Sequence, residues 1–177
     1  MTPDPPPVWI DVTGLYSALP SDGSIGDVMV GGEPFVVQSP EVTKACTEKT
    51  KTPCAGVQAV GGRDMETRGT SDDTRVEFVL FTFATAPEAS TMAKNLAERQ
   101  RAQYAEDGTP ATPVTLNAGA DETVAIREGN SFDVVLRIGA VVAHLQASDA
   151  NPADVAHAAT VQVARVKAVS NGVNPDR

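Results

Sequence analysis

The last third of the chain alternates between short apolar runs and turn-forming residues, a pattern typical of β-strands. Three strands are predicted there, at residues 123–126, 132–138 and 141–145. The sequences Glu128-Gly129-Asn130 and Gly139-Ala140 separate them as turns. At Asn151-Pro152, an asparagine suited to capping a helix precedes a proline suited to its first residue. The pattern predicts an antiparallel meander closed by a helix.

In the N-terminal half, the strongest strand prediction covers residues 75–84, where both faces carry apolar side chains. Such a pattern is typical of a central strand, because both faces of a central strand are covered. A helix is predicted from Pro87 to about Tyr104, and a second strand at residues 56–65. Ser39-Pro40-Glu41 is predicted to begin a further helix.

The remaining segments have no clear period, and their predictions rest on composition. They are an extended proline-rich lead or tether remnant at 1–7, a short helix or turn at 9–19, a loop at 21–34, and a polar connection at 67–74. Residues 8–172 are predicted to form one domain, followed by a tail at 173–177.

The predicted fold class is α+β, with a mainly antiparallel sheet and helices packed on one face. A strand leads into a proline-initiated helix twice, at 78–83 and at 141–146, which indicates either an internal pseudo-duplication or a coincidence. The chain has 177 residues, 41% hydrophobic and only 5% aromatic, so its single core is built from small side chains with a few phenylalanine anchors. The predicted anchors are Phe35, Phe78, Phe81, Phe83 and Phe132.

Charge and hydropathy exclude several classes of partner. A net charge of −9 and a pI near 4.6 oppose binding to nucleic acid, because the phosphate backbone repels an acidic surface. No apolar run approaches the roughly 20 residues of a membrane helix, so membrane contact is expected only through a removed N-terminal anchor.

The two cysteines, Cys46 and Cys54, are close in sequence and are predicted to form one disulfide, which implies an oxidising compartment. Two free thiols in a cytosolic protein are the alternative. The chain starts Met1-Thr2-Pro3-Asp4 without a signal peptide, so either the protein is cytosolic or Met1 replaces a removed export signal. The second interpretation is favoured.

No catalytic, cofactor or metal residue is assigned. His144 and His157 lack a recognisable partner, the acidic pairs Asp72-Asp73 and Asp121-Glu122 lack calcium-loop spacing, and Gly31-Gly32 and Gly61-Gly62 are predicted to be turns. Three of the five lysines surround the cysteine pair, namely Lys44, Lys49 and Lys51. They indicate either a docking patch for an anionic partner or a helix end stabilised by its dipole, and the second interpretation is preferred.

Three stretches together resemble a known group of proteins. They are residues 76–84 (VEFVLFTFA) leading into 86–89 (APEA), residues 134–142 (VVLRIGAVV), and the alanine- and valine-rich last helix. In this order they resemble the actinobacterial secreted sensor-domain proteins, which include lipoproteins and the extracellular domains of PknH-like receptor kinases. The resemblance implies an extracytoplasmic, non-enzymatic α+β domain, often membrane-tethered, with a cleft suspected of binding a ligand. Some members carry two disulfides, whereas this chain has cysteines for one.

The leading functional hypothesis is a secreted or lipid-anchored sensor or accessory domain for signalling at the cell envelope. It is expected to bind an envelope protein or a small ligand, to need no cofactor and to catalyse nothing. The alternative is a structural accessory subunit of a cell-envelope assembly, attached through the proline-rich N-terminus and the Trp9 cluster.

Overall fold

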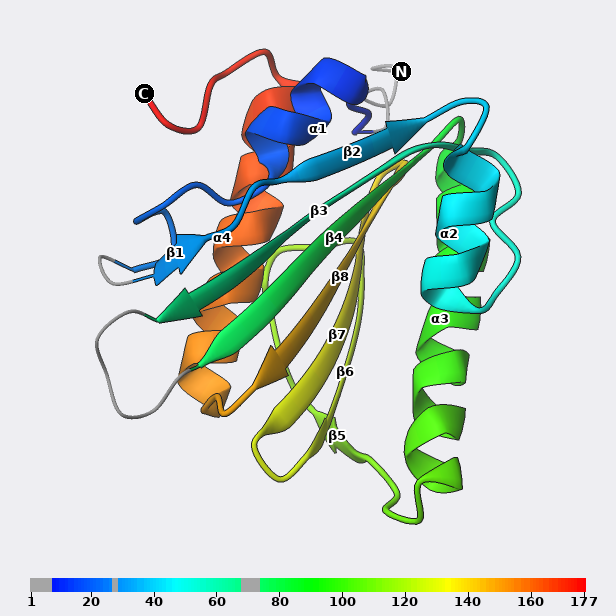
Figure 1. Cartoon of the computed structure of the whole chain (residues 1–177), viewed down its shortest axis with the longest axis vertical. Coiled ribbons are helices and arrows are strands. Elements are labelled where there is room, and N and C mark those ends of the chain that lie inside the picture. The colour runs from blue at the N-terminus through cyan, green and yellow to red at the C-terminus, as the bar shows by residue number, and fades with distance from the viewer. Residues whose placement is uncertain (1–7, 27–28, 68–73) are drawn as a thin grey trace, which may run out of the picture.

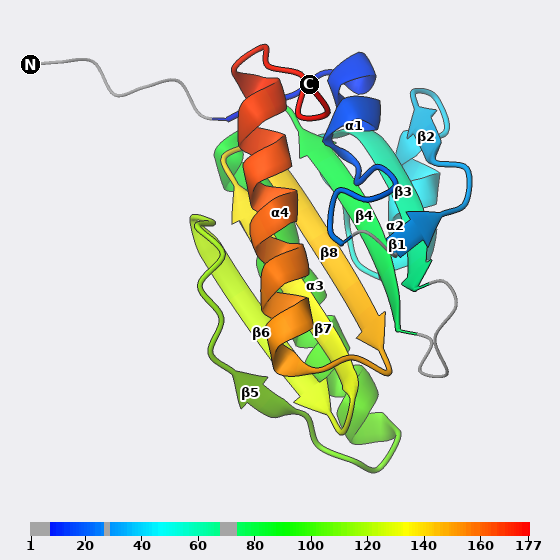
Figure 2. The ribbon, with the colours of Figure 1, turned by 90° about the vertical axis from the view of Figure 1, so that its left-hand side faces the viewer.

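A computed structural model describes residues 8–26, 29–67 and 74–177. They form an antiparallel sheet of eight strands with helices on both of its faces (Figures 1 and 2). The strand order is β1-β3-β4-β8-β7-β6-β5, and β2 also pairs with β3. The predicted α+β class and antiparallel sheet are confirmed. The proline-rich lead at 1–7 and the pair Asp72-Asp73 lie outside the described residues, and the domain boundary at 172 stays a prediction.

The structure confirms most of the predicted elements. The strands are β1 (Met29–Gly31), β2 (Phe35–Gln38), β3 (Val57–Thr67), β4 (Arg75–Phe83), β5 (Thr112–Val114), β6 (Glu122–Glu128), β7 (Ser131–Ile138) and β8 (Val141–Ser148). The helices are α1 (Val12–Ala18), α2 (Val42–Thr50), α3 (Ala86–Glu106) and α4 (Pro152–Ser170). The short strands β1, β2 and β5 were not predicted, because each is defined by pairing with a longer neighbour and not by its own pattern.

The predicted cap at Asn151 is confirmed, the helix predicted from Pro87 begins at Ala86 with a cap that was not predicted, and a third helix start differs. Asn151 accepts a hydrogen bond from the backbone N–H of Asp154 at 2.9 Å, and Thr85 caps α3 in the same way. The helix expected to begin at Ser39-Pro40 begins instead at Val42. Ser39 and Pro40 form a turn, in which the N–H of Glu41 bonds back to the carbonyl of Gln38.

Helices cover both faces of the sheet, whereas the sequence predicted packing on one face. On β4, Phe78 and Leu80 point into a core with α1 and α4, while Phe81 and Phe83 point into a second core with α2 and α3. Both faces of this strand are apolar, so each face requires its own cover. The two predicted strand–helix units, β4–α3 and β8–α4, therefore place their helices on opposite sides of the sheet (Figure 2).

Four of the five predicted phenylalanine anchors are buried, and the fifth is not. Phe78, Phe81, Phe83 and Phe132 belong to the core, but Phe35 is 46% exposed. The reason is its position on β2, an edge strand paired only with β3.

The predicted disulfide is present. Cys46 in α2 is bonded to Cys54, eight residues later, and both are buried in the α2–α3 core. The free-thiol alternative is excluded, and the bond ties α2 to the segment that enters β3. No helix within the described ranges is long and apolar enough to span a membrane.

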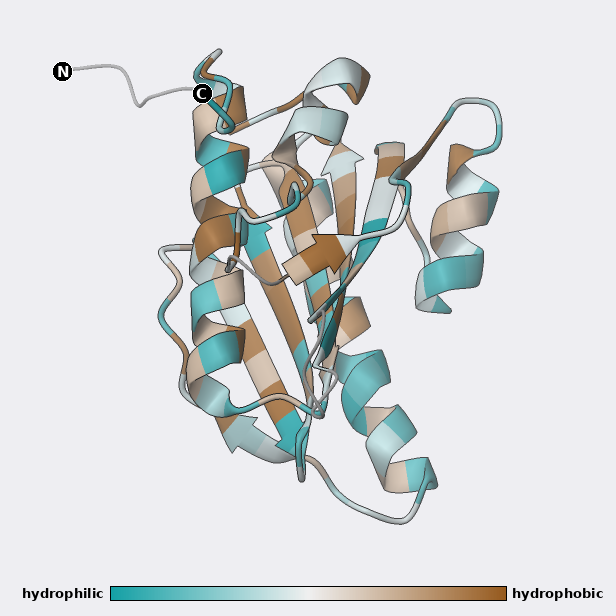
Figure 3. Ribbon diagram, turned by 60° about the vertical axis from the view of Figure 1, so that its left-hand side comes forward, coloured by the Kyte–Doolittle hydropathy of each residue, from teal (hydrophilic) through white to brown (hydrophobic). Residues whose placement is uncertain are grey.

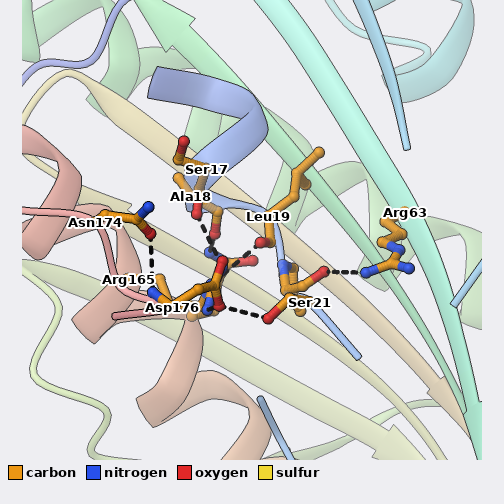
Figure 4. Close-up of polar contacts among 10 residues, drawn as sticks. Ser17, Ala18, Leu19, Ser21, Arg63, Arg165, Asn174 and Asp176 are labelled. Atoms are coloured by element: carbon orange, nitrogen blue, oxygen red, sulfur yellow. Dashed lines mark hydrogen bonds and ion pairs between the residues drawn. The ribbon is translucent and has the colours of Figure 1, made fainter. Parts of the chain in front are cut away.

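The last helix is joined to α1 and to the C-terminal residues by a buried arginine, in an arrangement that we call the arginine latch (Figure 4). Arg165 donates hydrogen bonds to the carbonyls of Ser17 at 2.9 Å and Leu19 at 3.1 Å, and Gln162 donates to the carbonyl of Ala18 at 2.8 Å. The last carbonyls of a helix have no partner within it, so α4 satisfies groups at the end of α1 that burial would otherwise leave unpaired.

Asp176 completes the latch. Its carboxylate pairs with Arg165 at 2.8 Å and accepts a hydrogen bond from the Ser21 hydroxyl at 2.5 Å. The hydrogen bond from Arg165 is the main cause of the lowered pKa of Asp176, and it outweighs the opposing effect of burial.

The first prediction concerns the pH dependence of this latch. A carboxyl whose pKa is lowered by folding adds stability above its unfolded pKa and loses that stability as pH falls through its folded pKa. Asp176→Asn should therefore lower the free energy of unfolding at neutral pH by about 1 kcal/mol, since the carboxylate is partly exposed. The difference from wild type should shrink as the pH falls below the ordinary aspartate value of 3.8.

Urea unfolding at pH 7 and at acidic pH measures the effect, and Arg165→Met supplies the control background. Asp176→Asn should cost almost nothing in that background, because its cation is absent. An equal cost in both backgrounds would show that Asp176 acts independently of Arg165.

Candidate ligand-binding cleft

The α2–α3 face of the sheet carries a line of polar side chains across four strands. Strand register places Asp64 beside Glu77, Glu77 beside Gln146, and Gln146 beside Asp133. Paired residues point to the same face, so these four side chains form one row, which we call the polar row. On β4 and β7 the next residues on this face, Val79 and Val135, are apolar. The polar row thus marks the place where the core on this face ends.

A cleft of about 500 Å³ opens at this end of the sheet. Its polar lining comes from β3, β4 and β8: Asp64, Glu66, Arg75, Glu77, Gln146 and Ser148. Helix α2 stands beside the upper part of the sheet and stops short of the lower ends of β4 and β8 (Figure 1). The C-terminal half of α3 is largely hydrophilic (Figure 3), so this side of the molecule presents polar groups from helix and sheet.

Charges in the cleft nearly balance. Lys49 of α2 reaches down to Glu77 at 2.7 Å, and Arg75 pairs with Glu66 at 3.4 Å. Asp64 is the third carboxyl. Burial raises its pKa, and the neighbouring Glu77 charge raises it further, while the Lys49 charge opposes the rise. The cleft therefore offers hydrogen-bond donors and acceptors together, without a strong net field.

The buried end of the polar row is a three-residue hydrogen-bond chain. The Tyr104 hydroxyl of α3 donates to Asp133 Oδ2 at 2.6 Å, and His144 Nε2 lies 2.8 Å from Asp133 Oδ1. Burial, together with the hydrogen bond to Asp133, raises the pKa of Tyr104 far above its ordinary value and keeps the phenol neutral. These two hydrogen bonds fix α3 to β7 and β8 beside the cleft.

The hydrogen-bonded set Tyr104–Asp133–His144 resembles part of a catalytic triad but lacks the nucleophile of a triad. Within the described ranges, the hydrogen-bond partner of His144 is Asp133, and no serine or threonine hydroxyl is bonded to it. The described residues also contain no group of three histidine, cysteine or acidic side chains placed to hold a metal ion. The geometry fits a structural role for Tyr104, Asp133 and His144.

The structure separates the three lysines singled out in the sequence. Lys49 contacts Glu77 in the cleft, Lys44 pairs with Glu48 at 3.9 Å on the exposed side of α2, and Lys51 is the C-cap residue of that helix. Lys49 and Lys51 thus stand where a helix dipole favours cations. A docking patch made by all three lysines stays a prediction.

Other sequence candidates have structural partners. His157 bonds to the carbonyl of Ile25 at 2.8 Å, and Asp121 and Glu122 both contact Arg137. Burial raises the pKa of Glu122, but hydrogen bonds from Ser90 and Arg137 outweigh it and leave the pKa lowered.

The prediction that Gly61-Gly62 forms a turn is wrong, because both residues lie inside β3. Close packing on both faces favours glycine there. A Cβ at Gly61 would lie 3.0 Å from the Leu15 side chain of α1, and one at Gly62 would lie 2.5 Å from the Phe35 ring. Gly31 ends β1, and Gly32 follows it at the edge of the cleft.

None of the residues of the polar row was predicted from the sequence to be a site residue. Each is a single polar residue within an otherwise apolar or mixed strand, as Asp133 is between Phe132 and Val134. Only the strand register brings them into one line, and register is not readable from one sequence.

Comparison with known proteins identifies the fold. No protein-family model and no curated protein sequence matches this chain. Among solved structures, it is similar to the extracellular domain of PknH from Mycobacterium tuberculosis, with a TM-score of 0.62 over 90% of this chain and 97% of that one. The two chains share a fold. Their sequence identity is 17%, so the likeness to the PknH domain concerns architecture and confirms the resemblance drawn from the strand–helix order.

The second prediction tests whether Tyr104 holds α3 against the sheet. Tyr104→Phe removes a hydrogen bond to a buried carboxylate and should lower the free energy of unfolding by about 1.5–3 kcal/mol, measured by urea denaturation. The matched control is Tyr16→Phe, since Tyr16 is half exposed on α1 and should change stability by less than about 0.5 kcal/mol. Equal effects of the two substitutions would contradict the role assigned to Tyr104.

Proposed function

We propose that this chain is an extracytoplasmic, non-enzymatic sensor-type domain that binds a ligand or a partner protein in the cleft at the polar row. The observation that carries the proposal is the row itself. Asp64, Glu77 and Gln146 line an open cavity next to an apolar core, where side chains with no recognition role would ordinarily continue the core. Cavities with a few convergent polar groups are the usual form of a binding site.

Two observations support a location outside the cytoplasm. Cys46 and Cys54 form a disulfide, which is rare in proteins of reducing compartments. The similar PknH domain is extracellular. We further propose that the protein in its full-length form is a lipoprotein or another membrane-anchored protein.

Binding without catalysis is supported by the way the buried groups are used. His144 and Asp133 are the pair best suited to acid–base chemistry, but Asp133 accepts the hydroxyl of Tyr104 and thereby fixes α3, while His144 bonds to the other oxygen of Asp133. Both cysteines are consumed in the disulfide and provide no thiolate nucleophile.

A structural accessory subunit remains the second candidate, favoured by two exposed aromatic residues near the N-terminus. Trp9 and Tyr16 are 47% and 50% exposed, respectively. They offer apolar surface for attachment to a larger assembly. Truncation of residues 1–19 does not separate the two functions, because Leu15 and Leu19 are core residues and their loss would unfold the domain.

The third prediction concerns the compartment. Protein purified from its native host should show the mass of an oxidised Cys46–Cys54 pair and an N-terminus that is processed or lipid-modified. Intact-mass measurement with and without reduction and alkylation tests both features. Two alkylatable thiols without reduction, on a chain that begins at an unmodified Met1, would contradict an extracytoplasmic function.

The fourth prediction locates the binding site. In an NMR screen of chemically diverse fragments, binders should shift the backbone amides of residues 64–66, 75–77 and 146–148, which line the cleft. Gln146→Ala should weaken these binders about tenfold, because a polar contact is lost without disturbing the core. Gln58→Ala, at the opposite end of β3, is the matched control and should leave affinity unchanged. Binders that map only to the surface of Trp9 and Tyr16 would favour the attachment subunit instead.

A further inference from the structure

An exposed aromatic ring lies on the same face of the sheet as the cleft, over a residue two positions along β3 from the cleft residue Asp64. Phe35 of β2 pairs with Gly62 of β3, and its ring occupies the space above this glycine on the α2–α3 face. The ring is 46% exposed, although it comes from one of the most apolar side chains in the protein. This exposure follows from the edge position of β2, and it leaves the ring free to contact a ligand on this face.

Phe35 lies beside the polar row. Gly62 and Asp64 are two residues apart on β3 and therefore present the same face, about 7 Å apart along the strand. Across the sheet, Gly62 is paired with Val79 and Asp64 with Glu77. The ring of Phe35 thus lies on the same face as Asp64 and Glu77, one step along the strands from them.

The polar groups of the cleft are mixed in kind. Lys49 and Arg75 donate, the carboxylates accept, and the amide of Gln146 does both. Each cation already has a carboxylate partner, and the third carboxyl, Asp64, has a raised pKa. Strong anions are repelled by three carboxyl groups, and the two cations reduce the attraction for positively charged ligands. Neutral hydroxyl groups, which both donate and accept, match this set best.

We propose that the ligand of the cleft is a neutral carbohydrate. This proposal rests on the binding function proposed above. A pyranose ring has one apolar face of C–H groups and a rim of hydroxyls. The apolar face packs on Phe35, and the hydroxyls bond to Asp64, Glu77 and Gln146. The volume of about 500 Å³ lies within the range of about 300–1,000 Å³ typical of small-molecule sites.

The test is a titration of the folded domain with neutral trisaccharides, namely maltotriose, cellotriose, mannotriose and triacetylchitotriose, followed by NMR shifts of the cleft amides. At least one should bind, and Phe35→Ala should weaken it about tenfold, as expected for loss of an aromatic contact. Phe35→Leu keeps an apolar side chain on Gly62 and should also lose affinity, which separates stacking from an effect on folding. Glu77→Gln should weaken binding through the hydroxyl contacts.

Trp9→Ala is the matched control. Trp9 is 47% exposed, nearly the same as Phe35, but its indole N–H bonds to Gln58 at the opposite end of β3 from Asp64. This substitution should leave saccharide affinity unchanged.

Spermidine and citrate serve as cationic and anionic probes. If either binds at the cleft amides while every trisaccharide fails at about 10 mM, a weak-binding limit, the carbohydrate proposal is overturned and the binding function stands. If no probe of any class binds there, both fail. Saccharide binding that survives Phe35→Ala also overturns the assignment.

Discussion

The structure depends on one strand that is apolar on both faces. Phe78 and Leu80 of β4 require cover on one side of the sheet, and Phe81 and Phe83 require it on the other. A single helical layer leaves one of these pairs in water, at a cost of about 1.5–3 kcal/mol for each large side chain. Helices α3 and α4 therefore lie on opposite faces (Figure 2), although each follows a strand of the same sheet.

The cleft lies where the side chains of β4 on the α2–α3 face stop being apolar. Toward its first residues, β4 replaces apolar side chains on the α2–α3 face with Glu77, and the neighbouring strands do the same with Asp64 and Gln146. Lys49 of helix α2 reaches this border, and the Cys46–Cys54 bond ties that helix to the segment that enters β3. On the other side, Tyr104 holds α3 to Asp133. The open part of the polar row, made by Asp64, Glu77 and Gln146, therefore lies between two elements that are each fastened to the sheet, which favours a preformed site over one assembled by the ligand.

Local signals in the sequence were sufficient for the elements but not for their arrangement. Asn151 and Pro152 predict the start of α4, and the short separation of Cys46 and Cys54 predicts their disulfide. Both features depend on residues that are close together in the sequence. The polar row needs the register of four strands, and the arginine latch joins Arg165 to Leu19 across 146 residues. Gly61-Gly62 resembled a turn because the side chains of Leu15 and Phe35 that fill its space come from other elements.

The central claim is that helices cover the apolar part of the α2–α3 face, while the cleft residues of the polar row are exposed to solvent. Two glutamine side chains report on it directly: Gln146 belongs to the row and is exposed, while Gln162 is fully buried beneath α1. The measurement is the NMR signal loss of each side-chain amide on addition of a soluble paramagnetic chelate. The account predicts strong loss at Gln146 together with the backbone amides of residues 146–148, and almost none at Gln162 or at residues 79–83. Equal protection of Gln146 and Gln162 would contradict it, because the polar row would then be buried and the cleft closed.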